Sequence, residues 1–149
     1  MEATVFAAVF AALHVAHSVG DHWVQTSCQS AHKGRPGWVG RLADARHVAT
    51  LTLTKLAVLL PVAWLLNLHL TVPGILAGLG IDAVTHWWAD RRTTLAWLAK
   101  VTGKGEFYRL GAPRVGHDDN PNIGTGAYAL DQSFHHLWLL VAALIIATV

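Results

Sequence analysis

Long apolar stretches separated by polar segments are the dominant pattern of the sequence. Four of them are long enough to cross a hydrocarbon core about 30 Å thick at a rise of about 1.5 Å per residue. They predict one all-α domain over residues 1–149, an integral membrane bundle of about four transmembrane helices. The predicted spans cover roughly residues 3–24, 46–70, 72–90 and 127–149.

A secretory signal peptide is the alternative interpretation of the first stretch. Glu2 stands where such a signal carries basic residues, and polar residues follow the stretch directly instead of a clear cleavage site. We therefore expect a retained first helix. Lys55 and Pro61 interrupt the second stretch, and a membrane helix tolerates a proline when its neighbours satisfy the freed carbonyl.

The basic residues lie between the apolar stretches. Ten of the 11 Lys and Arg lie at residues 33–46 and 91–114, and none lies between the second and third stretches. By the positive-inside rule, loops 25–45 and 91–126 are cytoplasmic and both termini lie outside, in an inner (cytoplasmic) membrane. Residues 93–101 predict a short amphipathic helix along the membrane interface.

The composition supports a lipid environment. Apolar residues make up 53% of the chain and charged residues only 13%, which leaves too few charges for an ordinary soluble surface. The net charge of +2 and the dispersed basic residues argue against nucleic-acid binding. The single Cys28 excludes an internal disulfide. Membrane lipid is the expected partner, and a homo-oligomer or a membrane-protein partner stays open.

Histidine and aspartate recur at intervals of four residues near one end of the predicted spans. This interval places side chains on one face of a helix. The predicted topology depends on Lys and Arg alone. All four spans nevertheless bring their His and Asp to the same, cytoplasmic end, so the two signals agree independently. These residues, together with one glutamine, are His17, Asp21 and Gln25 in the first span, His47 in the second, Asp82, His86 and Asp90 in the third, and Asp131 and His135 in the fourth.

These side chains predict a metal site. A carboxylate in hydrocarbon is costly unless it is paired, hydrated or bound to an ion. Neutral His and ionised Asp on neighbouring helices are common ligands of transition metals. Seven candidate ligands suffice for one or two divalent ions such as zinc, iron or manganese. They are His17, Asp21, His47, His86, Asp90, Asp131 and His135.

Each element, taken singly, also has an ordinary explanation. A His/Asp pair four residues apart often forms a local hydrogen bond, and Asp90 beside two arginines is typical of an interfacial salt bridge. His47 can begin a helix in solvent. Lys55 is expected to pair with Asp82 inside the bundle. The run HDDN at 117–120, before a proline, is typical of a turn.

The order and spacing of the motifs resemble a known family. HSVGDHWVQ at 17–25, His47, HWWADR at 86–91 and DQSFH at 131–135 are similar to the small bacterial and phage membrane family catalogued as domain of unknown function 3307. The resemblance covers nearly the whole chain and implies no particular activity. Members of that family carry a second His early in helix two, where this chain has TLT at 50–52.

The first functional hypothesis is a metal-dependent membrane hydrolase that acts on a lipid or a lipid-linked ester or phosphoester. A bound divalent ion lowers the pKa of water and polarises the bond under attack. Asp21 or Asp90 is a candidate general base, and Gln25 or Arg91 is a candidate to hold an oxyanion or a phosphate. The residues do not select phosphoester over ester or amide.

Two other classes of function stay open. One is a non-catalytic membrane module with a structural metal, which binds partner proteins. The other is a redox bundle that holds two irons or a haem, because facing histidines on four helices also suit iron. The three aspartates count against a haem, and the single layer of ligands counts against metal transport.

Overall fold

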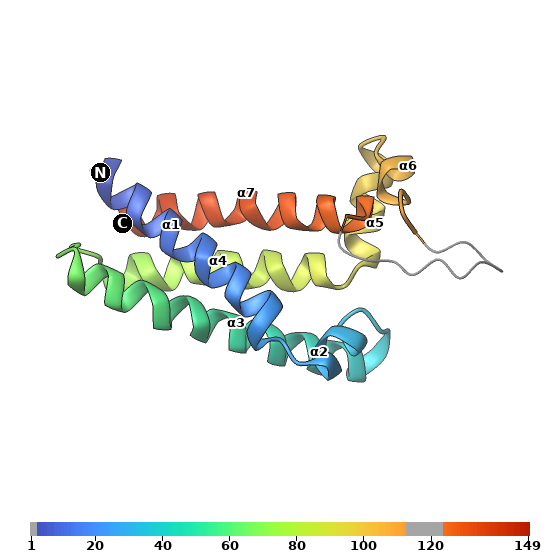
Figure 1. Ribbon diagram of the computed structural model, residues 1–149, viewed down its shortest axis with the longest axis horizontal. Coiled ribbons are helices and arrows are strands. Elements are labelled where there is room, and N and C mark those ends of the chain that lie inside the picture. The colour runs from blue at the N-terminus through green and yellow to red at the C-terminus, as the bar shows by residue number, and fades with distance from the viewer. Residues whose placement is uncertain (1–2, 113–123) are drawn as a thin grey trace.

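Helices are the only regular secondary structure in residues 3–112 and 124–149, which the computed structural model describes. This confirms the all-α class. Glu2 and the run at 117–120 lie outside the described residues. Long helices run along the long axis of the molecule (Figure 1). They are α1 (Ala3–Val19), α3 (Gly37–Leu65), α4 (Val72–Asp90) and α7 (Gly126–Thr148), and a π-helical turn, η1 (Gly20–Val24), continues α1.

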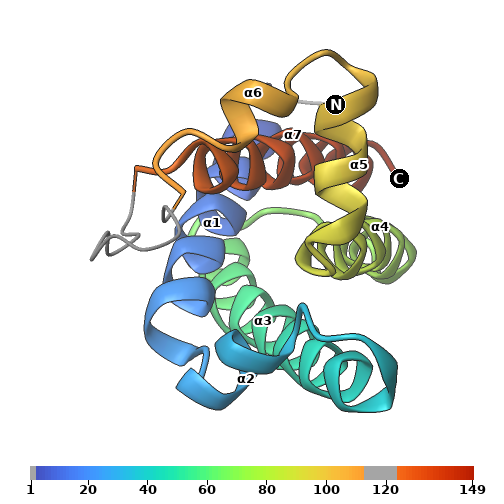
Figure 2. The same ribbon diagram turned by 90° about the vertical axis from the view of Figure 1, so that its right-hand side faces the viewer.

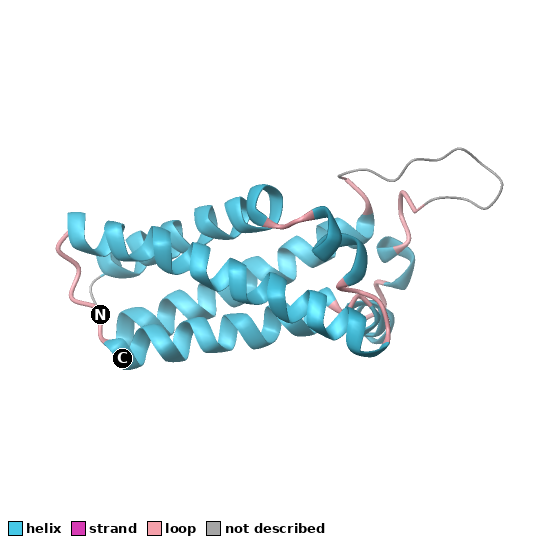
Figure 3. Cartoon of the chain, turned by 90° about the horizontal axis from the view of Figure 1, so that it is seen from below, coloured by secondary structure: helices cyan, strands magenta, loops and turns pink. Residues whose placement is uncertain are grey.

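Three short helices gather at the end of the bundle opposite to the two termini (Figures 1 and 3). They are α2 (Ser27–His32), α5 (Thr93–Val101) and α6 (Gly105–Tyr108). Seen from this end, α2 packs on α3, and α5 packs on α4 and α7 (Figure 2). The amphipathic helix predicted at 93–101 is confirmed as α5. We call this end of the bundle the site end, and the other the terminal end.

The largest difference from prediction is the start of the second long helix. α3 begins at Gly37 rather than at residue 46, and it ends at Leu65 rather than at 70. The additional turns contain polar residues, which hydropathy excludes from a span. They nevertheless continue one buried stripe, since the residues of α3 that are buried lie three or four positions apart: Gly40, Asp44, His47, Leu51, Lys55 and Leu59. His47 therefore lies well inside α3 instead of at its solvated start.

The apolar core lies toward the terminal end. Its buried members come from all four long helices: Val9, Ala12 and Leu13, Leu59, Leu79, and Leu139, Ala142, Ala143 and Ile146. α4 and α7 approach closely at Gly78, where an added Cβ would lie 2.7 Å from the carbonyl oxygen of Ala142. Small residues at such a crossing are typical of helices packed in membranes.

Three helices of the described chain are long and apolar enough to cross a membrane: Ala3–Val24, Gly37–Leu65 and Gly126–Thr148. α4 falls outside this group, because Asp82, His86 and Asp90 lower its hydropathy. Large apolar side chains also point outward along the helices, such as Leu53, Trp64, Val84 and Leu137. These features are consistent with a membrane protein.

Candidate metal centre

All seven predicted ligands meet at the site end. α1 and η1 contribute His17 and Asp21, α3 contributes His47, α4 contributes His86 and Asp90, and α7 contributes Asp131 and His135. They form three overlapping groups whose donor atoms lie within 4.8 Å of one another: His17, Asp21 and His86; His47, His86 and Asp90; and Asp90, Asp131 and His135. The structure therefore confirms that four helices bring these side chains together.

His47 Nε2 and His86 Nε2 lie at separations typical of metal ligands from each other and from one oxygen each of Asp21 and Asp90. His47 Nε2 lies 3.1 Å from His86 Nε2, 3.1 Å from Asp21 Oδ1 and 3.4 Å from Asp90 Oδ2. His86 Nε2 lies 3.7 Å from Asp21 Oδ1 and 3.2 Å from Asp90 Oδ2. Metal–ligand bonds of about 2.0–2.1 Å in a tetrahedron separate the donors by about 3.3–3.4 Å. We call these four side chains the first donor set.

Beside the first set lie His17, Asp131 and His135, which we call the second donor set. His17 Nε2 lies 3.5 Å from Asp21 Oδ2, the oxygen that does not face His47. His135 Nε2 lies 3.4 Å from Asp131 Oδ1, and the His135 ring stacks on His86 with centroids 4.0 Å apart. Asp21 thus directs its two oxygens to histidines of two different sets.

Several of these donors are buried without a hydrogen-bond partner among the described residues. They include His17 Nε2, Asp21 Oδ1, Asp90 Oδ2 and His135 Nε2. A buried polar atom that lacks a partner is destabilising by about 1–3 kcal/mol. Atoms that converge on one point without satisfying one another are well suited to a cation, because an ion accepts all of their lone pairs at once.

The π-helical turn η1 places Asp21. Its closing bond runs from the backbone N–H of Gln25 to the carbonyl of Gly20, at 2.9 Å. Gly20 lets this turn approach α3, since an added Cβ would lie 2.2 Å from Leu51 Cδ1. π-helical turns within α-helices are frequent at functional sites. The close approach brings Asp21 within reach of His47, which lies one turn before Leu51.

The partner of Asp90 is Lys33, which the sequence did not predict. Asp90 pairs with Lys33 Nζ at 2.8 Å, and no arginine in residues 3–112 or 124–149 forms the expected salt bridge with it. Arg91 instead donates hydrogen bonds to the carbonyls of Lys33 and Arg35. Its guanidinium is therefore committed to the α2–α3 connection rather than to the donor sets.

Asp44 is a buried carboxylate that sequence analysis missed. Its side chain is fully buried, and neither oxygen has a hydrogen-bond partner in the described part of the chain. The nearest cation is Arg91, 3.9 Å away. The spacing Asp44, His47, Leu51 was the available signal, but the predicted helix began after Asp44.

The ion pair expected one turn below the ligands is confirmed. Lys55 Nζ lies 2.5 Å from Asp82 Oδ2, and both side chains are buried. Removing one member of a buried pair leaves an uncompensated charge, so the two residues hold α3 and α4 together only as a pair. Neither belongs to the donor sets.

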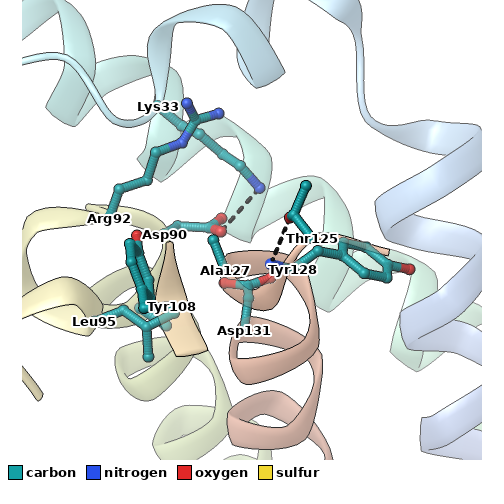
Figure 4. Close-up of a pocket in the computed structure, with 10 residues that line it drawn as sticks. Lys33, Asp90, Arg92, Leu95, Tyr108, Thr125, Ala127, Tyr128 and Asp131 are labelled. Carbon is teal, nitrogen blue, oxygen red and sulfur yellow. Dashed lines mark hydrogen bonds and ion pairs between the residues drawn. The ribbon is translucent and has the colours of Figure 1, made fainter. Parts of the chain in front are cut away.

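Two polar pockets open beside the ligands. The first polar pocket, of about 350 Å³, is lined by Lys33, Asp90, Arg92, Tyr108 and Asp131, among others (Figure 4). Burial and the negative charge of Asp131 raise the pKa of Tyr108 above its ordinary value, so its phenol stays a hydrogen-bond donor at neutral pH.

The second polar pocket, of about 620 Å³, adjoins the first. Asp21, Gln25 and Tyr128 line it, and Arg92 and Asp131 line both pockets. Gln25, predicted to hold an oxyanion, therefore lies beside a site ligand, whereas Arg91 does not line either pocket. Solvent has access to the ligands from this side.

No protein family, curated protein or solved structure matches this chain. The resemblance to the family of unknown function therefore stays a prediction, and so does hydrolysis. What the protein does must be inferred from the geometry of the centre and its pockets.

Proposed function

We propose that this protein is a metal-dependent hydrolase that sits in a membrane as a bundle of four transmembrane helices. α4 serves as the fourth span in this proposal. Its polar side chains are buried against the other helices, as with Asp82 on Lys55, and so avoid the cost of contact with lipid.

Exposed tryptophans support the same embedding. Trp38 and Trp64 lie near the two ends of α3 and are 80% and 81% exposed. At a rise of about 1.5 Å per residue they are about 39 Å apart along the axis. A bilayer that includes its headgroup regions is about 40–45 Å thick, and tryptophan prefers its two interfaces.

The observation that carries the proposal is Asp21, whose oxygens face two sets of histidines. The two donor sets would hold two divalent ions, with zinc, manganese or iron(II) as candidates. The first donor set would supply up to four protein ligands, which suits a structural ion. His17, His135 and Asp21 Oδ2 offer fewer donors to a second ion, and Asp21 lines the second polar pocket, which would leave room for water.

The ion at the open position supplies the chemistry by lowering the pKa of bound water and polarising the substrate. Asp131 takes the water's proton in this proposal. Its side chain is 27% exposed, the most of the seven ligands, and lines both pockets. Asp21, one of the two bases expected from the sequence, has both oxygens directed at histidines and would serve as a metal ligand instead.

A non-catalytic membrane module with a structural metal is the second candidate. The four closely spaced donors of the first set favour it, because closed four-coordinate sites are usually structural. The two candidates differ in the number of ions bound and in turnover.

The experiment compares wild-type protein with His86→Ala and with the matched control His69→Ala. His86 belongs to the first donor set, whereas His69 is exposed at the terminal end. Detergent-solubilised protein is loaded with zinc, manganese or iron(II), analysed for metal and given ester, amide and phosphoester substrates. We expect metal-dependent turnover in the wild type and in His69→Ala, and loss of metal and turnover in His86→Ala. One tightly held ion without turnover on any substrate would favour the structural module.

A further inference from the structure

An apolar groove lies beside the first polar pocket, between α5 and α7. Its volume is about 250 Å³, and its lining includes Leu95 and Leu98 of α5 and Leu130, Phe134 and Leu137 of α7. Leu137 is exposed, and Leu98, Leu130 and Phe134 are half-buried, so the groove is open to whatever surrounds the bundle.

The groove and the first polar pocket adjoin each other. Leu95 lines both. On α7, Leu130 lines the groove and the adjacent Asp131 lines the pocket. A molecule that occupies both would have a polar end against the ligands and an apolar end against α7.

The direction of the groove follows from α7. From Leu130 to Leu137 it descends about 10 Å toward the terminal end, at about 1.5 Å per residue. α7 is one of the three helices long and apolar enough to span a membrane. The groove therefore runs from headgroup depth into the hydrocarbon layer, where the abundant apolar occupant is a lipid chain.

The polar end of the site favours a phosphate group. Lys33 and Arg92 line the first polar pocket, and the ligands Asp90 and Asp131 stand beside them (Figure 4). A phosphate monoester carries nearly two negative charges at neutral pH and offers several acceptor oxygens. Two cationic side chains and a bound divalent ion match that charge, and the Tyr108 phenol supplies a further donor.

We infer that the substrate is a membrane lipid with a terminal phosphate monoester, whose phosphate occupies the first polar pocket and whose hydrocarbon chain occupies the groove. The inference rests on the proposed hydrolase function. In the reaction, the oxygen of water bonds to phosphorus and the bond from phosphorus to the lipid oxygen breaks. A proton of the water passes by way of Asp131 to the leaving oxygen, which gives a lipid alcohol and inorganic phosphate.

Binding of hydrolysis-resistant phosphonates tests the inference without requiring turnover. Methylphosphonate and dodecylphosphonate are titrated into the manganese-loaded, detergent-solubilised full chain. Ser133→Trp fills the groove from an exposed position, and Leu140→Trp is the matched control on α7, outside the groove. Leu98→Trp is a second groove-filling variant, in case Ser133→Trp does not fold.

We expect the wild type and Leu140→Trp to bind dodecylphosphonate more tightly than methylphosphonate. Filling the groove should weaken dodecylphosphonate binding about tenfold, the equivalent of about two methylene groups displaced. Binding of methylphosphonate should not change. Arg92→Gln should weaken both ligands by the same factor, because it acts on the phosphate.

The outcomes separate the two proposals. Equal binding of dodecylphosphonate by Ser133→Trp, Leu98→Trp and the wild type would overturn the lipid inference. If that result accompanied metal-dependent hydrolysis of a water-soluble phosphoester, the hydrolase proposal would stand alone. Chain-dependent phosphonate binding without hydrolysis of any lipid phosphate would overturn the hydrolase and, with it, the substrate assignment.

Discussion

Toward the terminal end, α1, α3, α4 and α7 pack apolar side chains such as Val9, Leu13 and Leu139 against one another, and all three are fully buried. Toward the site end, the same helices bury histidines and aspartates to nearly the same extent, including His17 and His47. The two halves thus share helices, packing partners and burial. They differ in whether the buried polar atoms have hydrogen-bond partners or, as in the apolar half, need none.

The difference concerns what each half needs from outside the chain. Apolar side chains are stabilised by burial itself, at roughly 25 cal/mol per Å² of apolar surface. Donors such as Asp90 Oδ2 and His135 Nε2 are buried without partners in the described residues. The terminal half is therefore self-sufficient, whereas the unpartnered donors of the site half would be satisfied by the proposed ions.

Leu139→Ala is the variant with the largest expected effect, and it separates the halves. Truncating a fully buried leucine costs about 2–5 kcal/mol, so its unfolding midpoint should fall with and without metal. A site that binds ions at 100 times their Kd adds about 2.7 kcal/mol to the stability. Chelation should remove that increment equally from Leu139→Ala and from the wild type. A chelator response that disappears in Leu139→Ala would show that the halves are coupled, which would contradict the comparison.

The terminal half was the more predictable of the two. Its long apolar runs define the helices by composition, and the placement of Lys and Arg correctly separated the two ends. The intervals of four in His17–Asp21, His86–Asp90 and Asp131–His135 also placed the ligands on common faces. Hydropathy and residue spacing depend only on neighbouring residues, so a single sequence is enough to detect them.

The site half was less predictable, because its geometry depends on packing between helices. Hydropathy ended the second span before Asp44, although the buried stripe of α3 continues through it. The π-helical turn at Asp21 depends on how closely η1 approaches Leu51, which no local pattern specifies. Lys33, on the α2–α3 connection, pairs with Asp90 across 57 positions of the chain, counted from 33 to 90.

Gly20→Val should disturb the site half without affecting the terminal half. The new side chain would meet Leu51, and the resulting shift of η1 should separate Asp21 from His47. We expect metal affinity to fall about 10–100-fold, the range seen when support for a ligand is lost. The measurement is a metal titration monitored by competition with a chromophoric chelator.

Gly80→Val is the control for this variant, since an added Cβ at Gly80 meets nothing within 4 Å. Combining Gly20→Val with Leu51→Ala should restore part of the affinity by making room for the valine. Unchanged affinity in Gly20→Val would mean that the approach of η1 to α3 does not position Asp21.

Lys33→Gln has the smallest expected effect and tests whether charge within the site half is balanced by the ion. The Lys33 ammonium and a bound divalent ion would share the Asp90 carboxylate, one on each oxygen, so the two cations repel each other. Removing the lysine charge should tighten metal binding by about two- to fivefold, in line with about 0.5–1 kcal/mol for a pair near the surface. High salt should reduce this gain only slightly, because salt screens a largely buried pair less than an exposed one. Lys100→Gln, a charge change at an exposed residue of α5, should produce no gain. Weaker metal binding in Lys33→Gln would instead mean that Lys33 holds Asp90 in its ligating position, and the site half would then be partly organised before any ion arrives.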